Sequence, residues 1–288
     1  MVGPEGMRVV AVPREGAAEW TRPGWPRPGL TLLLAYSAVL LLFLLVPLGA
    51  VLWRALSAGD LGRYLTSPIV VDALRLSLLT TLLTLVVAVV LGTPIAYLLA
   101  RYQFPGRALI DTALDLPMVL PPAVAGVALL LTFGRRGLLG PTLSAFGIEI
   151  SFTTAAVVLA QLFVAAPFYV KAAQAGFAAV DRELEHVSAS LGVSALGTFW
   201  RVTLPLALPA LLGGAVMTWA RALGEFGATI LFAGNFQGRT QTMPLAIYVA
   251  MERDLGAALV LASILVVASF LVLLGFKLLA RARLAPVA

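Results

Sequence analysis

Six long apolar stretches constrain this sequence more than any other feature. A helix needs about 20 mostly apolar residues to cross the hydrocarbon core of a bilayer. The stretches cover roughly residues 30–53, 74–100, 109–133, 153–177, 204–234 and 257–280. Because no other part of the chain offers a comparable hydrophobic pattern, the sequence predicts an all-α, polytopic membrane protein with six transmembrane helices.

The composition agrees with a membrane protein and excludes several other classes. Apolar residues make up 60% of the 288 residues and charged residues only 12%, whereas a soluble domain is about 45–50% apolar and about 25% charged. The chain has no cysteine and one histidine, His186, which excludes disulfides, thiolate catalysis, cysteine-type zinc sites and multi-histidine metal sites. No nucleophile–base set and no phosphate-binding loop is visible, so we expect no catalytic residue and no metal site.

The distribution of Lys and Arg indicates the orientation, because cytoplasmic loops carry an excess of both. With the N-terminus inside, the inside segments hold 12 of the 20 basic residues, Lys171 among them, and the outside loops hold 7. We therefore expect both termini in the cytoplasm. Residues 1–28 are expected to form a flexible tail, 29–283 the transmembrane domain and 284–288 a C-terminal tail. The net charge of +6 is explained by topology and anionic lipid, not by nucleic acid.

The longest inside segment, about residues 178–203, has the pattern of an amphipathic helix pair. Asp181 is expected to cap a helix with acidic residues in its first turn, Gly192 interrupts the pattern, and Pro205 marks the start of the fifth span. One interpretation is a plain interfacial helix pair, and the other is a docking surface for a cytoplasmic partner. The apolar positions of the pair are Leu184, Val187, Leu191, Leu196, Phe199 and Trp200.

The spacing around Gly192 resembles the cytoplasmic loop of ABC importer permeases. In those proteins Glu-Ala-Ala is followed by three residues, Gly, nine residues and Ile-x-Leu-Pro. Here Gly192 precedes Val202-Thr203-Leu204-Pro205 at that distance, while the Glu-Ala-Ala positions hold His186, Val187 and Ser188, and Glu185 stands one residue early. The resemblance implies that the ATPase-coupling loop, about residues 181–204, uses Glu185, His186, Ser188, Gly192, Leu204 and Pro205.

Further segments extend the resemblance over roughly residues 35–280. They are FPGR (104–107), LPMVLPP (116–122), FGRRGLLG (133–140), ARALGEFGATILFAGN (220–235) and TQTMPLAI (240–247). Together they resemble the permease subunit of molybdate/tungstate ABC importers, which implies the type I ABC importer permease fold with a cytoplasmic coupling helix pair. Sulfate/thiosulfate permeases share much of the GEFG region, so sulfate remains the alternative anion.

The same resemblance implies the partners and the location. Two permeases, here a homodimer, would pair with a dimer of ATP-binding cassette ATPases, which would bind the ATP and Mg. A periplasmic or lipid-anchored binding protein would deliver the oxyanion. This chain would bind no cofactor, would not itself be an enzyme, and would lie in a bacterial or archaeal cell (inner) membrane in contact with lipid.

Polar residues inside the fifth stretch suggest where an anion could pass. Arg221 and Glu225 lie four residues apart, with Gly224 and Gly227 beside them. Ionisable groups in hydrocarbon are costly unless they are paired or wet. The pair is therefore either an ion pair that fixes helix packing or a polar element beside the translocation path.

The third stretch opens with acidic residues and then turns proline-rich. Asp115, Pro117, Pro121 and Pro122 predict irregular backbone over 115–126, either lining the path or forming a purely architectural kink. Arg135 and Arg136 follow on the outer side, where they would attract an oxyanion, contact a binding protein or serve as ordinary loop charges. A proton-coupled secondary transporter with Glu225 or Asp115 as proton carrier is an alternative.

Overall fold

The computed structural model describes residues 27–57 and 61–284. Nearly all of the predicted tail at 1–28, and residues 285–288, lie outside the described residues, so those domain limits stay predictions. The chain divides into two compact units, residues 1–49 and residues 50–288. Helix α1 (Arg27–Ser57) contributes to both, and its part from Leu30 to Ser57 is long and apolar enough to cross a membrane.

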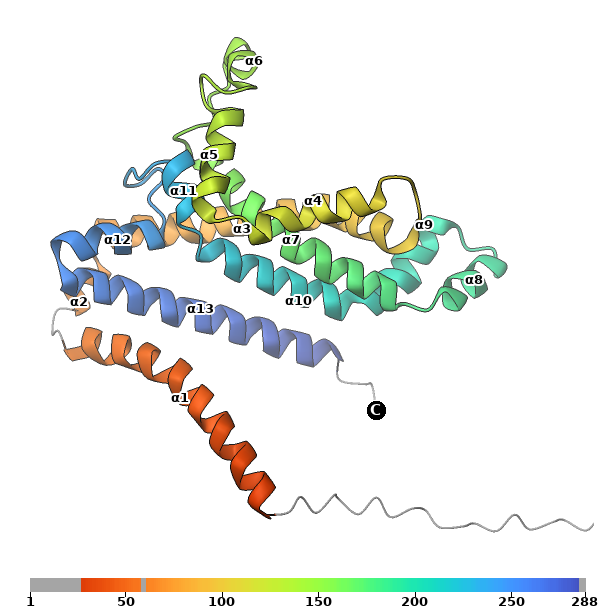
Figure 1. The fold of residues 1–288 in the computed structure, drawn as a ribbon, viewed down its shortest axis with the longest axis horizontal. Helices are drawn as coiled ribbons and strands as arrows, with labels where there is room; N and C mark the ends of the chain where they lie inside the picture. Colours follow the sequence, from red (N-terminus) through yellow and green to blue (C-terminus); the bar gives the residue numbers. More distant parts are fainter. Residues whose placement is uncertain (1–26, 58–60, 285–288) are drawn as a thin grey trace, which may run out of the picture. The chain divides into compact units, whose positions relative to one another are not determined.

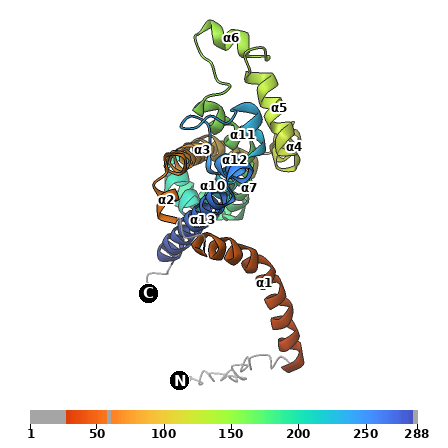
Figure 2. The ribbon, with the colours of Figure 1, turned by 90° about the vertical axis from the view of Figure 1, so that its left-hand side faces the viewer.

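The second unit is built around three long helices that lie side by side (Figures 1 and 2). They are α3 (Pro68–Arg101), α7 (Thr154–Ala179) and α10 (Leu204–Leu223). Small residues let them approach closely: a Cβ added at Gly214 would lie 2.7 Å from the Cβ of Ala172. Helix α13 (Leu255–Leu284) runs along α10 and packs on α12 (Met243–Arg253).

The third predicted span is a bent pair of helices. Between helix α4 (Arg107–Val119) and α5 (Pro122–Phe133) the chain bends by 116°, and Figures 1 and 2 show α5 pointing away from the long helices. Pro121 and Pro122 carry no N–H, and a residue before proline avoids the helical region. Only Leu120 and Pro121 leave the helix, so the expectation of irregular backbone over 115–126 is wrong in extent.

The fifth predicted span differs from the structure at both ends. Helix α9 (Ala195–Thr198), the π-helical turn η1 (Phe199–Thr203) and α10 run on as one apolar span from Ala195 to Leu223. The predicted span 204–234 therefore starts too late. It also ends too late, because the backbone leaves the helix at Gly224 and resumes as the short helix α11 (Gly227–Phe232).

Besides α11, four short helices connect the spans in the described part of the chain. Helix α8 (Arg182–Ser190) lies at one end of the long helices, and α2 (Leu61–Leu65) and α12 lie at the other (Figure 1). Helix α6 (Gly140–Ala145) follows α5. Five helices and the bent pair α4–α5 together account for the six predicted spans.

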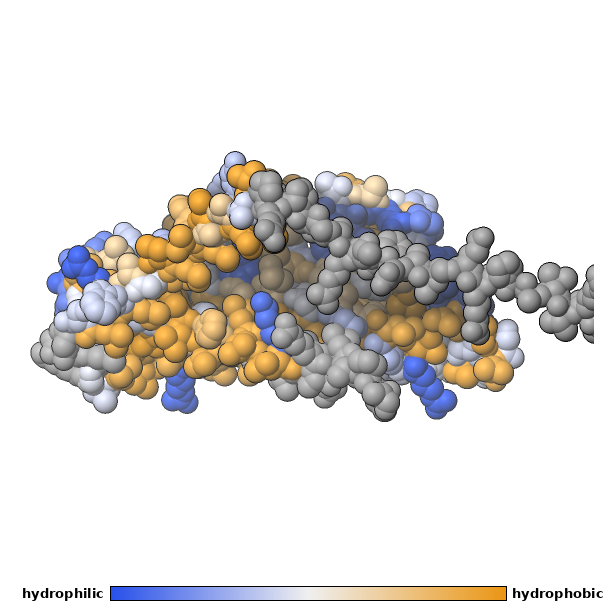
Figure 3. Space-filling view, turned by 90° about the horizontal axis from the view of Figure 1, so that it is seen from below, coloured by the Kyte–Doolittle hydropathy of each residue, from blue (hydrophilic) through white to orange (hydrophobic). Residues whose placement is uncertain are grey.

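Many large apolar side chains are exposed on the surface of the described residues, as is typical of a membrane protein. Figure 3 shows one side on which hydrophobic residues cover most of the coloured surface. On α13 the exposed residues include Val267, Phe270 and Leu271, and on α3 Leu82 and Val90. Contiguous apolar surface of this size marks contact with lipid or with another protein.

Candidate functional site

Residues 181–204, which we call the coupling segment, form a well-capped helix pair. The carboxylate of Asp181 accepts a hydrogen bond from the backbone N–H of Glu183 (2.9 Å), as predicted for the N-terminus of α8. At the other end of α8, Gly192 has φ +78° and its N–H donates to the carbonyl of Ala189 (2.9 Å). This left-handed conformation favours glycine. The hydroxyls of Ser188 and Thr198, 2.9 Å apart and buried, then join α8 to α9.

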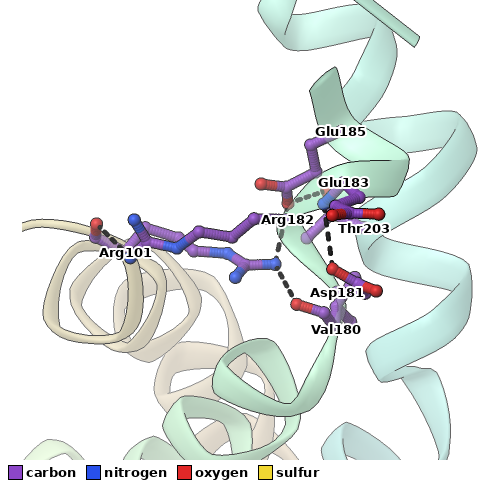
Figure 4. Close-up of polar contacts among 7 residues, drawn as sticks. All are labelled: Arg101, Val180, Asp181, Arg182, Glu183, Glu185 and Thr203. Carbon is purple, nitrogen blue, oxygen red and sulfur yellow. Dashed lines mark hydrogen bonds and ion pairs between the residues drawn. The ribbon is translucent and has the colours of Figure 1, made fainter. Parts of the chain in front are cut away.

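Glu185 lies where three elements meet (Figure 4). One oxygen, Oε1, accepts from Nη2 of Arg101 (2.9 Å), the last residue of α3, and from Oγ1 of Thr203 (2.6 Å) in η1. Arg101 also donates to the carbonyl of Val180 (3.0 Å). Only 6% of the Arg101 side chain and 18% of that of Glu185 are exposed. Glu185 therefore fixes the coupling segment to the end of α3.

The coupling segment also carries several exposed apolar side chains. Leu191 is 78% exposed and Leu196 69%, and His186 is exposed among them. Such residues are left unburied within the described part of the chain although their spacing is that of an amphipathic helix. The exposed apolar side chains of the segment are Leu184, Val187, Leu191, Leu196 and Trp200, of which Leu196 and Trp200 also line an apolar groove with residues of α3 and α10.

The π-helical turn places Pro205 inside a continuous span. Pro205 has no N–H to donate, which would leave a gap in an α-helical ladder. In η1 the N–H of Leu204 donates to the carbonyl of Phe199, five residues earlier. A π turn of this kind widens the helix locally and is frequent at functional sites. Leu204 and Pro205 thus link the coupling segment to α10 without a break.

Arg221 and Glu225 do form an ion pair, but they do not lie on one helix. Nη1 of Arg221 in α10 lies 2.8 Å from Oε2 of Glu225, which is 1% exposed and lies beyond the end of α10. The other oxygen, Oε1, accepts from the N–H of Ala228 at the start of α11 (2.8 Å). Glu225 therefore joins the end of α10 to the beginning of α11 across the non-helical residues 224–226.

Helices α5 and α11 touch through glycine. A Cβ added at Gly227 would lie 2.8 Å from the Cβ of Pro122, and one added at Gly126 would lie 3.0 Å from the Cα of Ala228. The break in the third span and the break in the fifth thus meet, and we call this contact the junction of broken helices. Gly224, by contrast, has no such close neighbour, since its nearest contact is 3.8 Å away.

A lysine that sequence analysis assigned to an inside segment lies within a span. Nζ of Lys171 in α7 is 2.9 Å from Oδ1 of Asp111 and 2.9 Å from Oδ1 of Asp115, both in α4. Pro117 follows Asp115 two residues later in the same helix. The signal that was missed is a charge about two turns inside an apolar stretch, which requires a partner at the same depth.

Arg135 and Arg136, which are predicted to lie on the outer side, differ in their contacts. Nη2 of Arg135 lies 2.8 Å from Oε2 of Glu149, with both side chains exposed. This hydrogen bond raises the pKa of Arg135 above its usual value. Arg136 is also exposed. The two therefore remain candidates for attracting an anion.

Comparison with known proteins assigns the family. Residues 92–284 match the family described as "Binding-protein-dependent transport system inner membrane component". The chain belongs to this family. Its members are membrane components of transporters, not enzymes, and the chain is accordingly a multi-pass membrane protein.

Three relatives of this transport family are similar over most of their length. The chain is 45% identical to the "Molybdenum transport system permease protein ModB" of Mycobacterium tuberculosis, covering 77% of this chain and 84% of that protein. It is 42% identical to a "Probable molybdenum ABC transporter permease protein" of Haloferax volcanii (82% and 84% covered). It is 37% identical to the "Sulfate transport system permease protein CysT" of Salmonella typhimurium (82% and 87% covered).

Solved transporter structures share the fold at low sequence identity. A bacterial ABC transporter that imports the acidic polysaccharide alginate superposes with a TM-score of 0.71 at 16% identity, covering 89% of this chain and 96% of that one. The same kind of transporter in complex with a periplasmic protein that holds an alginate pentasaccharide gives a TM-score of 0.66 at 18% identity, covering 87% and 91%. The predicted ABC importer permease fold is confirmed.

Proposed function

We propose that this chain is the permease subunit of an ATP-driven importer that carries molybdate, and with it tungstate, across the cell membrane. The observation that carries the proposal is the 45% identity to a molybdenum permease over 84% of that protein. A second molybdenum relative from an archaeon supports it. Sulfate is the alternative cargo, since a sulfate permease is 37% identical.

The import of a divalent anion requires a source of energy. A membrane potential that is negative inside opposes each charge by about 2.3 kcal/mol per 100 mV. We propose that a dimer of ATP-binding cassette ATPases binds ATP and Mg and supplies this energy to a homodimer of the chain. A periplasmic or lipid-anchored binding protein would deliver the anion, in keeping with the alginate transporter that was solved with its periplasmic protein.

The coupling segment is proposed to receive the movement of the ATPase. Its exposed apolar face fits a cleft on a partner, with His186 exposed on the same helix. Glu185, Ser188 and Gly192 would act as positioning residues, because Ser188 and Gly192 bond within the segment and Glu185 bonds to Arg101 at the end of α3. Since η1 joins the segment to α10, a push on it would pass along the span from Ala195 to Leu223, about 43 Å for 29 helical residues.

The translocation path is proposed to run beside the junction of broken helices. Non-helical backbone at membrane depth is tolerated where it is buried in protein or lines a cavity. A movement of α10 would reach this junction at Gly224 and pass through Glu225 to α11. Arg221 and Lys171 would attract the anion without holding it tightly, because each already has a carboxylate partner. The candidate residues of the path are Asp115, Pro117, Pro121, Pro122, Arg221, Gly224, Glu225 and Gly227.

Reconstitution tests this proposal. The chain, its ATPase and its binding protein are placed in liposomes, and uptake of molybdate, tungstate and sulfate is measured with and without ATP. We expect molybdate uptake that requires ATP, the ATPase and the binding protein, with sulfate competing weakly. Liposomes that hold the chain alone are the control. Uptake by the chain alone, driven by a proton gradient, would instead establish a secondary transporter, and a preference for sulfate would establish the alternative cargo.

A further inference from the structure

A small pocket with two arginines lies at the end of α7 that is remote from the coupling segment. Its volume is about 360 Å³, within the usual range for small-molecule sites. The residues that matter for its chemistry are Arg135, Glu149, Ser151, Phe152, Phe236 and Arg239. We call it the arginine pocket.

The charges of the arginine pocket favour an anion. Glu149 is hydrogen-bonded to Arg135 (2.8 Å), so one guanidinium is partly neutralised. Arg239 has no carboxylate within ion-pair distance among the residues that the structure describes. The formal balance is two positive side chains against one negative, and a guanidinium matches an oxyanion with two parallel N–H donors. The hydroxyl of Ser151 adds a further donor.

The walls of the pocket are fixed by backbone contacts. The carbonyl of Arg239 accepts from Oγ1 of Thr154 at the start of α7 (2.9 Å), and that of Phe236 accepts from the N–H of Arg239 (3.1 Å). The Phe152 and Phe236 rings meet edge to face with centroids 6.4 Å apart. Phe152 also has φ +61°, the one positive φ of a non-glycine residue in the described chain. Such strained residues concentrate at functional sites.

The position of the pocket relates it to the direction of transport. Helix α7 has 26 residues, or about 39 Å at 1.5 Å per residue, which is enough to cross the bilayer. Ser151 and Phe152 of the pocket come just before the first turn of α7, and the coupling segment follows its last. If the coupling segment faces the cytoplasm, the pocket faces the side from which anions arrive.

We propose that the arginine pocket binds a tetrahedral oxyanion of the molybdate class before it enters the path. Arg239 and Arg135 donate hydrogen bonds to the anion. The hydrogen bond from Arg135 to Glu149 breaks when the anion binds. The competing carboxylate keeps the affinity low, so that the anion can move on. This inference rests on the proposed function for the identity of its ligand.

Arginine labelling gives a direct test of binding. The purified transporter is treated with phenylglyoxal, and modification of Arg239 is followed by mass spectrometry in molybdate or in chloride at equal ionic strength. We expect molybdate to protect Arg239 and Arg135 but not Arg253, an exposed arginine at the end of α12. Glu149→Gln should strengthen the protection because the competitor of the anion is lost. Equal labelling of Arg239 in both salts would overturn the proposal.

Uptake supplies the second readout. Arg239→Gln should lower ATP-dependent molybdate uptake about tenfold, the order expected when hydrogen bonds to a charged group are lost, and Arg239→Lys should retain part of it. Arg253→Gln is the matched control and should not change uptake. If Arg239→Gln instead weakens docking of the binding protein, the pocket is a protein contact and the proposal fails. If molybdate protects Arg239 but the wild-type complex takes up no molybdate, the pocket stands and the proposed function fails.

Discussion

Nη2 of Arg101 donates a hydrogen bond to Oε1 of Glu185 across 2.9 Å and so joins the last residue of α3 to the middle of α8. The same carboxylate oxygen accepts from Thr203, which leads into α10. A single half-buried carboxylate therefore holds the coupling segment against two spans. This contact makes the segment a rigid extension of the bundle rather than a loose loop, which is what the transmission of movement requires.

Glu185→Ala should loosen the coupling segment. The change leaves the guanidinium of Arg101, 6% exposed, without its carboxylate, and we expect a loss of about 2–3 kcal/mol in the free energy of unfolding. Denaturant unfolding and hydrogen exchange over 181–204 measure it. Glu183→Ala is the control, because this exposed neighbour contributes its backbone N–H rather than its side chain. Equal stability of the two variants would show that the contact does not support the segment.

Gly192 should resist substitution because of its backbone conformation and not because of crowding. Its φ is +78° and an added Cβ meets nothing within 4 Å. Gly192→Ala should therefore cost about 1–2 kcal/mol, and Gly192→Asn less, since Asn tolerates the left-handed region. Co-purification of the ATPase should fall in the order Gly, Asn, Ala, Val. Anion binding to the binding protein should not change. Normal ATPase assembly in Gly192→Val would contradict docking through the coupling segment.

The sequence predicted the spans and the local signals of the coupling segment. Asp181 caps α8, and Gly192 ends it in the left-handed conformation, as expected from residue type alone. Such features depend on neighbours within a few residues. The bend of the third span was also expected from Pro121 and Pro122, although its narrow extent was not.

Contacts between distant residues were not predictable from one sequence. Lys171 pairs with Asp111 and Asp115, which are 60 and 56 residues away, and its charge was assigned to an inside segment. The bonds of Glu185 Oε1 to Arg101 and Thr203 were likewise not foreseen, while its predicted place in the ATPase-coupling loop stays a prediction. The break at Gly224 was missed because the apolar residues continue on both sides of it. Each miss concerns tertiary packing, which hydropathy does not report.

Gly126→Ala should separate α5 from α11. The added Cβ would lie 3.0 Å from the Cα and from the carbonyl oxygen of Ala228, and backbone atoms cannot rotate away. We expect about 1–3 kcal/mol of destabilisation, together with slower uptake if the junction of broken helices lines the path. The control is Gly213→Ala in α10, where nothing lies within 4 Å. In this control the change from Gly to Ala raises helix propensity and should stabilise the protein by up to about 1 kcal/mol. Similar melting of the two variants would argue against close packing at the junction.

Substitutions of Glu225 separate packing from transport. Glu225→Ala removes the partner of Arg221 and the acceptor for Ala228, and we expect it to cost about 2–3 kcal/mol, because Glu225 is buried while Arg221 is 28% exposed and can be hydrated. Glu225→Gln keeps the acceptor and should remain folded but transport slowly. The double variant Arg221→Gln/Glu225→Gln should recover stability, since no unpaired charge remains, without recovering uptake. Full uptake by the double variant would assign the pair to packing alone.

Lys171 should be necessary only while both aspartates are charged. Lys171→Gln leaves Asp111 and Asp115 facing each other one turn apart in α4. We expect a loss of about 1–2 kcal/mol in the free energy of unfolding, moderated because water reaches Asp115. Adding Asp111→Asn and Asp115→Asn should restore most of the lost stability, which a double-mutant cycle between Lys171 and each aspartate would measure.

Because the neutral triple variant keeps the helices but loses the charge of Lys171, its uptake reports whether that charge attracts the anion. Stability lost equally in the single and the triple variant would mean that the aliphatic chain of Lys171, and not its charge, supports the contact between α4 and α7.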